Sequence, residues 1–582
     1  MVGKYRRVWR SYGKRPGMAA LGFSAAVASA LVSMIAPSLV RRAVDVLAAG
    51  GDPRRALPFA LGIVGVAAVS GFLLFAQRML LVGISRHLEH ELRTEAFAHL
   101  LRLPASFFSS QRVGDLLTRL SSDVQAVRMA MGPALMYVAS TTTILVSAVV
   151  LMLRIDVTLT LASLSMAPAV ALTAKFFGSR IYRRWNVAQE ELSRFTARLQ
   201  EHLVGLRVLR AFACEEQEKK TLGELNLAYF RASLRLVNVQ ALFFPLLQFL
   251  IGVGFVVVLG YGGYKVVARS LSLGQFVEFN LYLARLIWPM IAVGWVANLW
   301  QRGAASMARI EELFSQTPEL PALPGPRPAK PAPSKALSVA FTGVRFSYPG
   351  APGPALRGVT LTVPAGRRVA ILGEVGSGKS TLLSLVPRLL TPPPGTVFVD
   401  GRDVLQWDLE ELRGTVVMVP QTAFLFSATL RENICMGKPE ASDQEVWEVV
   451  ARAGLEPDVA NLPQGLQTVV GERGVTLSGG QRQRVALARA LLLQPAVLLL
   501  DDCLSAVDRS TEAKILGELP RTTLLFATHR VSVAKTADWV VILERGEVAE
   551  EGTPSQLAAA GGRWAQLLAL EELEEETMEA RG

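Results

Sequence analysis

Six long apolar segments constrain the fold of this 582-residue chain more than any other feature. They lie near residues 17–40, 57–77, 129–153, 157–174, 241–264 and 276–300. A helix of about 20 apolar residues spans the hydrocarbon core of a bilayer and satisfies its own backbone polar groups there. Charged residues make up only 19% of the chain, against about 25% in ordinary soluble domains. The segments therefore predict a membrane α-helical bundle of six transmembrane helices.

The basic residues predict how this bundle is oriented. Six of them precede the first segment: Lys4, Arg6, Arg7, Arg10, Lys14 and Arg15. Because Lys and Arg gather on the cytoplasmic side of membranes, the chain is expected to begin in the cytosol and, with an even number of spans, to end there. The stretches 83–128 and 175–236 are expected to be cytoplasmic helices, and the links near 41–56, 154–157 and 265–275 to be short outer turns. The four arginines of the first outer turn go against this rule.

Two ionisable residues, Glu278 and Arg285, lie inside the last apolar segment. A charge buried in hydrocarbon costs several kcal/mol, so these side chains should face a wet cavity or a protein neighbour. The alternative is a structural pair seven residues apart on one helix face, or side chains that reach the headgroup level. The sequence leaves these interpretations open.

A proline-dense segment at 315–335 divides the chain. Such a segment forms neither helix nor sheet and is typical of an extended, semi-rigid linker. Residues 1–314 are then the transmembrane domain. In residues 336–582 short apolar strands alternate with helices, which predicts a cytosolic α/β domain with an acidic C-terminal tail that is solvated or pairs with a partner. The three cysteines are scattered and provide neither a disulfide framework nor a zinc site.

A glycine-rich loop, GEVGSGKST at 373–381, carries the clearest chemistry. It follows an apolar strand and opens an apolar helix, the context in which backbone N–H groups surround phosphates at a helix N-terminus. Its lysine is expected to reach the β- and γ-phosphates of ATP, and the serine after the lysine to bind Mg²⁺. The residues of this loop predicted to hold the cofactor are Gly373, Gly376, Gly378, Lys379, Ser380 and Thr381.

Two further motifs extend this site. The apolar strand at 496–500 ends in Asp501 and Asp502, at the strand end where ligands of α/β sheets bind, so Asp501 is predicted to hold Mg²⁺. Residues 478–481 (Ser478, Gly479, Gly480 and Gln481) open another helix and form a second potential anion site. One ATP does not need both sites, which suggests that the second serves the nucleotide of another subunit.

In this order the motifs resemble those of ATP-binding cassette exporter half-transporters, in which six membrane helices are fused to one P-loop ATPase domain, and the resemblance covers almost the whole chain. It implies that Tyr348 stacks on adenine, that Gln421 links Mg²⁺ to the interface with the membrane domain, and that His529 is the switch histidine. It also implies that the LSGGQ signature at 477–481 binds the opposite subunit's γ-phosphate and that Asp508 lies in the loop crossing the dimer interface.

One residue departs from this family pattern. Such exporters normally place Glu directly after the Mg²⁺ aspartate to polarise the attacking water, whereas this chain has Asp502. The shorter side chain predicts intact nucleotide binding but slow hydrolysis at this chain's own site. That split resembles heterodimeric multidrug and peptide exporters, in which one site mainly holds ATP. Two alternatives stay open: a homodimer that uses Asp502 as a weak base, and an ATP-gated channel or regulatory subunit that hardly hydrolyses ATP.

The sequence thus predicts a multi-pass subunit of an ATP-driven exporter in the cytoplasmic (inner) membrane, with both termini and the ATPase domain in the cytosol. The expected cofactors are ATP and Mg²⁺. The expected partners are a second half-transporter that carries the catalytic Glu, membrane lipids, and an amphipathic drug, lipid or peptide as cargo. Nucleic acid is not expected as a partner. In a chain with apolar spans, the net charge of +12 is explained by Lys and Arg on the cytoplasmic side of the membrane.

Overall fold

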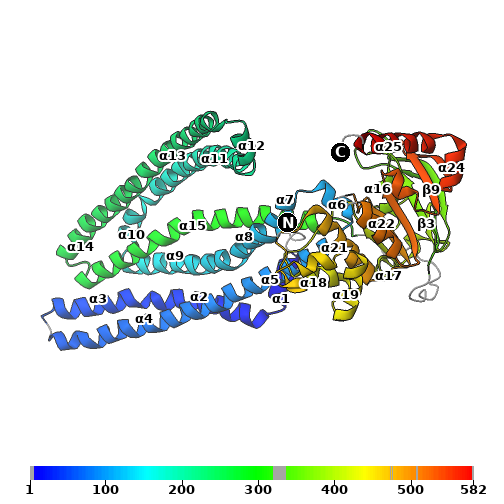
Figure 1. The fold of residues 1–582 in the computed structure, drawn as a ribbon. Coiled ribbons are helices and arrows are strands. Elements are labelled where there is room, and N and C mark those ends of the chain that lie inside the picture. The colour runs from blue at the N-terminus through cyan, green and yellow to red at the C-terminus, as the bar shows by residue number, and fades with distance from the viewer. Residues whose placement is uncertain are drawn as a thin grey trace. The chain divides into compact units, whose positions relative to one another are not determined.

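The computed structural model describes residues 6–50, 52–318, 336–471, 474, 476–505, 507 and 509–579. The chain forms two compact units, which we call the helical unit (residues 1–98 and 114–315) and the sheet unit (residues 99–113 and 316–582). Figure 1 labels elements of both units. Residues 319–335 of the predicted linker lie outside the described residues.

Six stretches of helix among the described residues are long and apolar enough to cross a membrane, which confirms the predicted number of spans. They are Pro16–Ala48, Pro53–Leu100, Val113–Ile155, Val157–Val204, Glu215–Val267 and Leu273–Phe314. The α-helices up to the end of the last span are α1 (Arg6–Gly13), α2 (Pro16–Ser33), α3 (Ile35–Ala48), α4 (Leu57–Gln77), α5 (Gly83–Leu100), α6 (Ala105–Ser110), α7 (Val113–Thr118), α8 (Val124–Met129), α9 (Leu135–Ile155), α10 (Val157–Leu164), α11 (Ala167–Val204), α12 (Leu206–Ala211), α13 (Glu215–Val257), α14 (Gly263–Val267) and α15 (Leu273–Phe314). Between them lie the short 3₁₀ helix η2 (Pro53–Ala56) and the π-helical turns η3 (Arg78–Val82), η4 (Arg119–Asp123), η5 (Ala130–Ala134) and η6 (Val258–Gly262).

The first outer turn is shorter than the sequence predicts. Helix α3 continues to Ala48, so Arg41 and Arg42 lie on a helix instead of in a turn. The guanidinium of Arg41 lies 3.7 Å from the carboxylate of Asp45, one turn further on, and 3.3 Å from that of Glu278 on α15. Because the protein supplies these counter-charges itself, the helix can carry charged residues beyond the apolar run.

The structure pairs Glu278 with Arg41 and not with Arg285. Glu278 is 5% exposed, and its second carboxylate oxygen accepts a hydrogen bond of 3.2 Å from the Tyr282 hydroxyl. That hydroxyl also lies 3.0 Å from the carbonyl oxygen of Met34, between α2 and α3. Of the interpretations that the sequence leaves open, the pair with Arg285 on the same helix is therefore not formed, and Glu278 faces a protein neighbour. The side chain of Glu278 instead connects two spans that lie more than 200 positions apart in the sequence.

A second buried acid, Asp123, joins the third span to the last. Its side chain accepts a hydrogen bond of 2.8 Å from Arg309 Nε and one of 2.9 Å from Ser306 Oγ, both on α15. The carboxylate is almost fully buried, whereas the arginine side chain is about half exposed at 49%. Since a buried carboxylate is stable only when it is paired, this contact fixes how the two helices pack.

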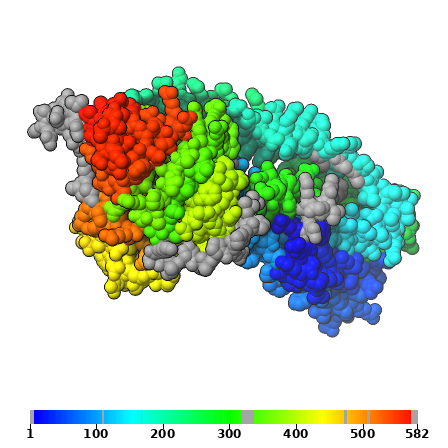
Figure 2. All heavy atoms as spheres, turned by 90° about the vertical axis from the view of Figure 1, so that its right-hand side faces the viewer, coloured from blue at the N-terminus to red at the C-terminus, as the bar shows by residue number. Residues whose placement is uncertain are grey.

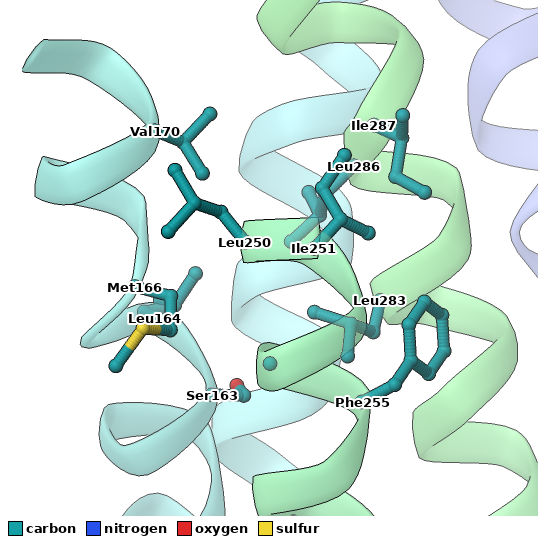
Figure 3. Close-up of a pocket in the computed structure, with 11 residues that line it drawn as sticks. Ser163, Leu164, Met166, Val170, Leu250, Ile251, Phe255, Leu283, Leu286 and Ile287 are labelled. Atoms are coloured by element: carbon teal, nitrogen blue, oxygen red, sulfur yellow. The ribbon is translucent and has the colours of Figure 1, made fainter. Parts of the chain in front are cut away.

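Apolar contacts fill the space between α10, α11, α13 and α15, where a pocket of only about 60 Å³ is left. Figure 3 shows side chains from these helices, among them Leu250, Ile251, Leu283 and Leu286, converging on it. Apart from Ser163, the side chains that the figure labels are apolar. This pocket is therefore a packing defect of the bundle and has no room for a drug-sized molecule.

The sheet unit contains two sheets. The smaller is antiparallel, with the strand order β2-β1-β4-β5, and the larger has the order β10-β9-β3-β8-β7-β6. In the larger sheet β9, β3, β8, β7 and β6 are parallel, and β10 pairs antiparallel with β9. The strands are β1 (Val339–Phe346), β2 (Leu356–Val363), β3 (Arg368–Leu372), β4 (Val397–Val399), β5 (Arg402–Asp403), β6 (Val416–Val419), β7 (Val497–Asp501), β8 (Thr523–Thr528), β9 (Trp539–Glu544) and β10 (Glu547–Gly552).

The central strands β7 and β8 of the larger sheet are buried along their whole lengths, which shows that both faces of the sheet are covered there. The helices are α16 (Lys379–Leu385), α17 (Leu409–Thr415), α18 (Leu430–Ile434), α19 (Asp443–Arg452), α20 (Glu456–Ala460), α21 (Gly479–Leu492), α22 (Arg509–Glu518), α23 (Val531–Ala534), α24 (Pro554–Ala560) and α25 (Arg563–Glu579), with short 3₁₀ turns at Val404–Gln406, Cys435–Gly437 and Gly465–Gln467. Figure 2 shows the C-terminal helices in red on one face of this unit. Two packed layers on a mainly parallel sheet agree with the predicted α/β class.

Candidate functional site

Four parallel strands end at one edge of the larger sheet and bring most of the predicted residues together there. Strand β3 leads into the glycine-rich loop, β7 into Asp501 and Asp502, β8 toward His529 and β6 toward Gln421. The strands are in register, since Leu372 of β3 pairs with Thr528 of β8 and Asp501 of β7 with Ala527 of β8. This is the edge at which open α/β sheets bind ligands.

The glycine-rich loop has the backbone that a phosphate-binding loop needs. Gly376 and Gly378 have φ of +86° and +104°, a left-handed region that other residues rarely adopt. A Cβ atom on Gly373 would lie 2.3 Å from the carbonyl oxygen of Leu543, so no larger residue fits there. Nζ of Lys379 folds back to donate to the carbonyl oxygens of Gly373 at 2.6 Å and Glu374 at 2.9 Å. The loop is thus pre-shaped, and its cation lies at the N-terminus of α16.

Ser380 and Asp501 form the candidate metal-binding pair. The Ser380 hydroxyl donates to Oδ1 of Asp501 at 2.8 Å, and Asp501 is 5% exposed. Burial raises the pKa of Asp501 above its ordinary value, although this hydrogen bond opposes the shift. Burial also lowers the pKa of Lys379. A hydroxyl beside a carboxylate offers the hard oxygen donors that Mg²⁺ prefers, so the residues present fit this ion.

Asp502, His529 and Gln421, the residues that the family resemblance assigns to catalysis, meet at the carboxylate of Asp502. Oδ1 of Asp502 lies 3.2 Å from Nδ1 of His529, and Oδ2 accepts a hydrogen bond of 3.3 Å from Nε2 of Gln421. Asp502 has a φ of +47°, and its backbone N–H donates to the carbonyl oxygen of Ala527 on β8. The turn after β7 therefore holds the carboxylate between an imidazole and an amide, beside the glycine-rich loop.

Tyr348 lies against the helix that the glycine-rich loop opens. Its hydroxyl and the hydroxyl of Thr381 are 3.0 Å apart, and its ring packs edge-on against Phe346 with centroids 5.2 Å apart. The ring is 42% exposed. An exposed aromatic face beside the loop is suitable for stacking on a nucleobase.

The signature residues form a separate helix start. Ser478 caps α21 in a reciprocal capping box with Gln481, whose side chain also donates to Asp458 at 2.8 Å. Ser478 and Gly479 are exposed. Among the described residues, no hydrogen bond or ion pair connects 478–481 with the glycine-rich loop. Asp508 lies outside the described residues.

Comparisons with known proteins cover both halves of the chain. Residues 19–290 match a model of the ABC transporter transmembrane region, and residues 356–505 match the ABC transporter model. The chain is 35% identical over 539 residues to the probable multidrug resistance ABC transporter ATP-binding/permease protein YheI of Bacillus subtilis, with 91% of each chain covered. It is 33% identical to the multidrug resistance-like ATP-binding protein MdlA of Escherichia coli, with 98% of this chain and 96% of MdlA covered. The chain belongs to the ABC transporter family.

A solved structure shows the same fold in an ABC exporter. A bacterial Atm1-family ABC exporter with ATP bound matches 95% of this chain with a TM-score of 0.77 and 27% identity. The predicted architecture, six membrane helices fused to an ABC ATPase domain, is thereby confirmed. As a member of the multidrug exporter family, this ABC transporter is a multi-pass membrane protein that uses ATP hydrolysis for export. ABC ATPase domains in general bind ATP with Mg²⁺. ABC exporters of this kind work as pairs of halves.

The structure of this ABC transporter also shows two contacting residues that no sequence motif marks. Asp458 accepts from Gln481 and forms an ion pair with Arg484 at 2.7 Å, so it holds the first turn of α21. Arg41 is the partner of Glu278. Neither residue belongs to a motif, and each lies far along the chain from the group it contacts, so no local signal in the sequence marks it.

Proposed function

We propose that this chain is the mainly ATP-holding subunit of a heterodimeric exporter that moves amphipathic drugs, lipids or peptides out across the cytoplasmic membrane. The observation that carries the proposal is that Asp502, and not a glutamate, directly follows Asp501 at the end of β7. Its side chain is one methylene shorter than that of Glu, which withdraws the carboxylate by about 1.5 Å. A misplacement of about 1 Å can slow a reaction about 100-fold.

The remaining residues of the site are assigned to binding. Lys379 and the backbone of the loop around Gly373, Gly376, Gly378 and Thr381 would hold the phosphates, and Tyr348 would stack on the adenine. Ser380, Asp501 and Gln421 would hold Mg²⁺, which neutralises phosphate charge when bound. The contact between Ser380 and Asp501 and the shape of the loop support full nucleotide affinity despite slow chemistry.

The signature residues are assigned to the ATP of the other subunit. Ser478, Gly479, Gly480 and Gln481 start a 14-residue helix whose N-terminal N–H groups favour an anion. Ser478 and Gly479 are exposed, which leaves this helix start accessible to a partner. Asp508 would lie at the same interface. In this arrangement the chain completes a competent site in which the partner, a different half-transporter, supplies the catalytic Glu.

The domain borders and orientation follow from the same proposal. Residues 1–314 form the transmembrane domain, 315–335 the linker and 336–582 the nucleotide-binding domain. Both termini and this last domain lie in the cytosol. The basic N-terminal residues and the even number of spans support this orientation.

A homodimer is the second candidate, and a specific contact favours it. His529 is retained and lies 3.2 Å from Asp502, so the site keeps a carboxylate–imidazole pair that can orient water weakly. In that case each of two identical sites would hydrolyse ATP at a reduced rate. An ATP-gated channel or regulatory subunit, the third alternative, would not hydrolyse ATP in any assembly.

The test is ATP turnover of the purified full-length chain, alone and co-expressed with neighbouring half-transporter genes. Each assembly is compared with its Asp502→Glu variant. The proposal predicts turnover only with a partner, dependent on the partner's Glu and insensitive to Asp502→Asn. Vigorous turnover of the chain alone would overturn the heterodimer. Absence of vanadate trapping in every assembly would favour the channel or regulatory subunit.

A further inference from the structure

The helical unit contains a cavity of about 480 Å³ that is unlike the apolar pocket of Figure 3. Its walls come from α2, from α4 with the adjoining turn η3, from α9, and from Trp288 of α15. A volume of this size suits a drug-sized molecule or the end of a peptide. The cavity lies along apolar spans, so a ligand could reach it from the bilayer.

The walls of this cavity carry many small side chains with hydroxyl groups. Ser29 donates its proton across to the carbonyl oxygen of Ser70 at 3.1 Å, and Ser33 donates to Ala30 at 2.7 Å. On α9, Ser140 and Thr141 donate to carbonyl oxygens four residues earlier. Because each hydroxyl has a single proton and uses it within the protein, only its oxygen lone pairs are left for a ligand. The walls therefore present hydrogen-bond acceptors.

Gln77, which lines the same cavity, contributes a polar atom without a partner. The residue is 2% exposed, and its Oε1 has no hydrogen-bond partner among the residues that the structure describes. A buried amide oxygen in this state is unstable unless a donor reaches it. A ligand that carries an N–H group into the cavity would provide that donor.

Arg78 is the next residue along and the only charged residue among those that line the cavity in the described part of the helical unit. It begins the π-helical turn η3, a helix irregularity that is frequent at functional sites. No carboxylate forms an ion pair with Arg78 among the described residues. Its guanidinium is therefore available to an anionic group of a ligand, and its flat fork suits a carboxylate.

We propose that this cavity binds an amphiphile that ends in a carboxylate next to an amide N–H, as at the C-terminal end of a short apolar peptide or in an N-acylated amino acid. The carboxylate pairs with Arg78, and the adjacent N–H donates to Oε1 of Gln77. The apolar part lies along Trp288 and Tyr137, whose ring packs edge-on against Trp295 at 5.0 Å. This assignment rests on the proposed export function and specifies its substrate class.

The test measures binding in the absence of nucleotide, so its outcome does not depend on Asp502 or on the heterodimer. The full-length transporter is reconstituted in phosphatidylcholine nanodiscs, and binding of a fluorescent N-acetylated apolar heptapeptide is followed by anisotropy. The same peptide with a C-terminal amide is the comparison. The free acid should bind at least tenfold more tightly than the amide.

Substitutions assign this preference to residues. Arg78→Gln should reduce the affinity of the free acid to that of the amide and leave the amide unchanged, whereas Arg78→Lys should restore part of the preference. Gln77→Leu should weaken both peptides. Gln301 and Arg302 form a matched control, because they are an exposed Gln–Arg pair on α15 outside the cavity lining. Gln301→Leu and Arg302→Gln should leave both affinities unchanged.

Two results would overturn the proposal. One is that the Arg78→Gln variant, with unchanged thermal stability, still binds the free-acid peptide more tightly than the amide peptide. The other is displacement of the peptide when phosphatidylglycerol replaces part of the phosphatidylcholine, since the cavity would then hold a lipid headgroup. Unchanged peptide affinity in those nanodiscs supports the peptide assignment.

Discussion

The glycine-rich loop and the cavity at Gln77 and Arg78, for which we propose a ligand, are built in different ways. In the sheet unit, Lys379 and the loop before it come from one continuous stretch of chain, and Lys379 donates to carbonyl oxygens of that same loop. In the helical unit, Gln77 and Arg78 line a cavity whose walls come from four separate spans, and within the described part of the chain Oε1 of Gln77 has no hydrogen-bond partner. The first site is shaped before any ligand arrives, whereas the second leaves a polar group for the ligand to satisfy.

The largest effect is expected for Lys379→Ala. The substitution removes the only side-chain cation of the glycine-rich loop, so nucleotide affinity at this site should fall by at least about 100-fold, or about 2.7 kcal/mol. Photolabelling of this chain with an azido-ATP, in the assembled transporter, measures the loss. Lys535→Ala is the control, since this lysine follows α23 and lies outside the site. Labelling that survives Lys379→Ala would mean that the backbone of the loop alone holds the phosphates.

A smaller effect, on stability, is expected when Asp123, a buried carboxylate that already has partners, is replaced. Asp123→Ala removes the buried carboxylate that Arg309 and Ser306 contact. Loss of one partner of a buried pair costs about 3 kcal/mol or more, but Arg309 is half exposed and can be hydrated, so we expect about 2 kcal/mol. The thermal midpoint of the reconstituted protein should fall. Asp115→Ala, at an exposed acid of α7, should leave it unchanged.

Glu278→Gln should have a milder effect. The amide retains a hydrogen bond with Tyr282 and loses only the charge that faces Arg41 at 3.3 Å, so we expect about 1 kcal/mol of lost stability. A double-mutant cycle with Arg41→Gln measures the coupling of the pair. Transport changes with unaltered stability would contradict a structural role and indicate that Glu278 faces the cargo.

The smallest effect concerns pH at the metal-binding pair. Burial raises the pKa of Asp501, so protons compete with Mg²⁺ for its carboxylate at a higher pH than for an exposed aspartate. Protonation of this carboxylate should therefore lower the affinity for Mg²⁺–ATP as the pH is lowered, by at most about tenfold per pH unit beyond the effect of protonating ATP itself. Titration of the assembled transporter with Mg²⁺–ATP at several pH values measures it. Asp501→Asn should remove this pH dependence along with much of the Mg²⁺ affinity.

The nucleotide site could be predicted from the sequence because its chemistry is local. The glycines, Lys379 and Ser380 are consecutive, and Asp501 ends a strand whose apolar run marks it as buried on both faces. Parallel strands then bring these separate motifs to one sheet edge. The number of spans was equally predictable, since length and hydropathy determine it.

The cavity and the buried ion pairs could not be predicted in this way. The partner of Glu278 is 237 positions away, and the sequence offered Arg285, seven residues away, as the nearest cation. Ser29 and Gln77 belong to apolar runs in which single polar residues are usually structural. Only the packing of the spans shows that these side chains surround one space. Helix α3 ends at Ala48, later than the sequence predicts, and Arg41 in its extension takes part in the same long-range pair.

Helix α13 has a mechanical consequence. Its 43 residues give a rod of about 64 Å at 1.5 Å per residue, about twice the hydrocarbon thickness of a bilayer. About 35 Å of this rod must therefore extend beyond the hydrocarbon core, with α11 beside it as an antiparallel strut of 38 residues. A tilt of about 10° at the membrane would displace the far end by about 6 Å. Small angular changes in the membrane thus become displacements as large as one helical turn.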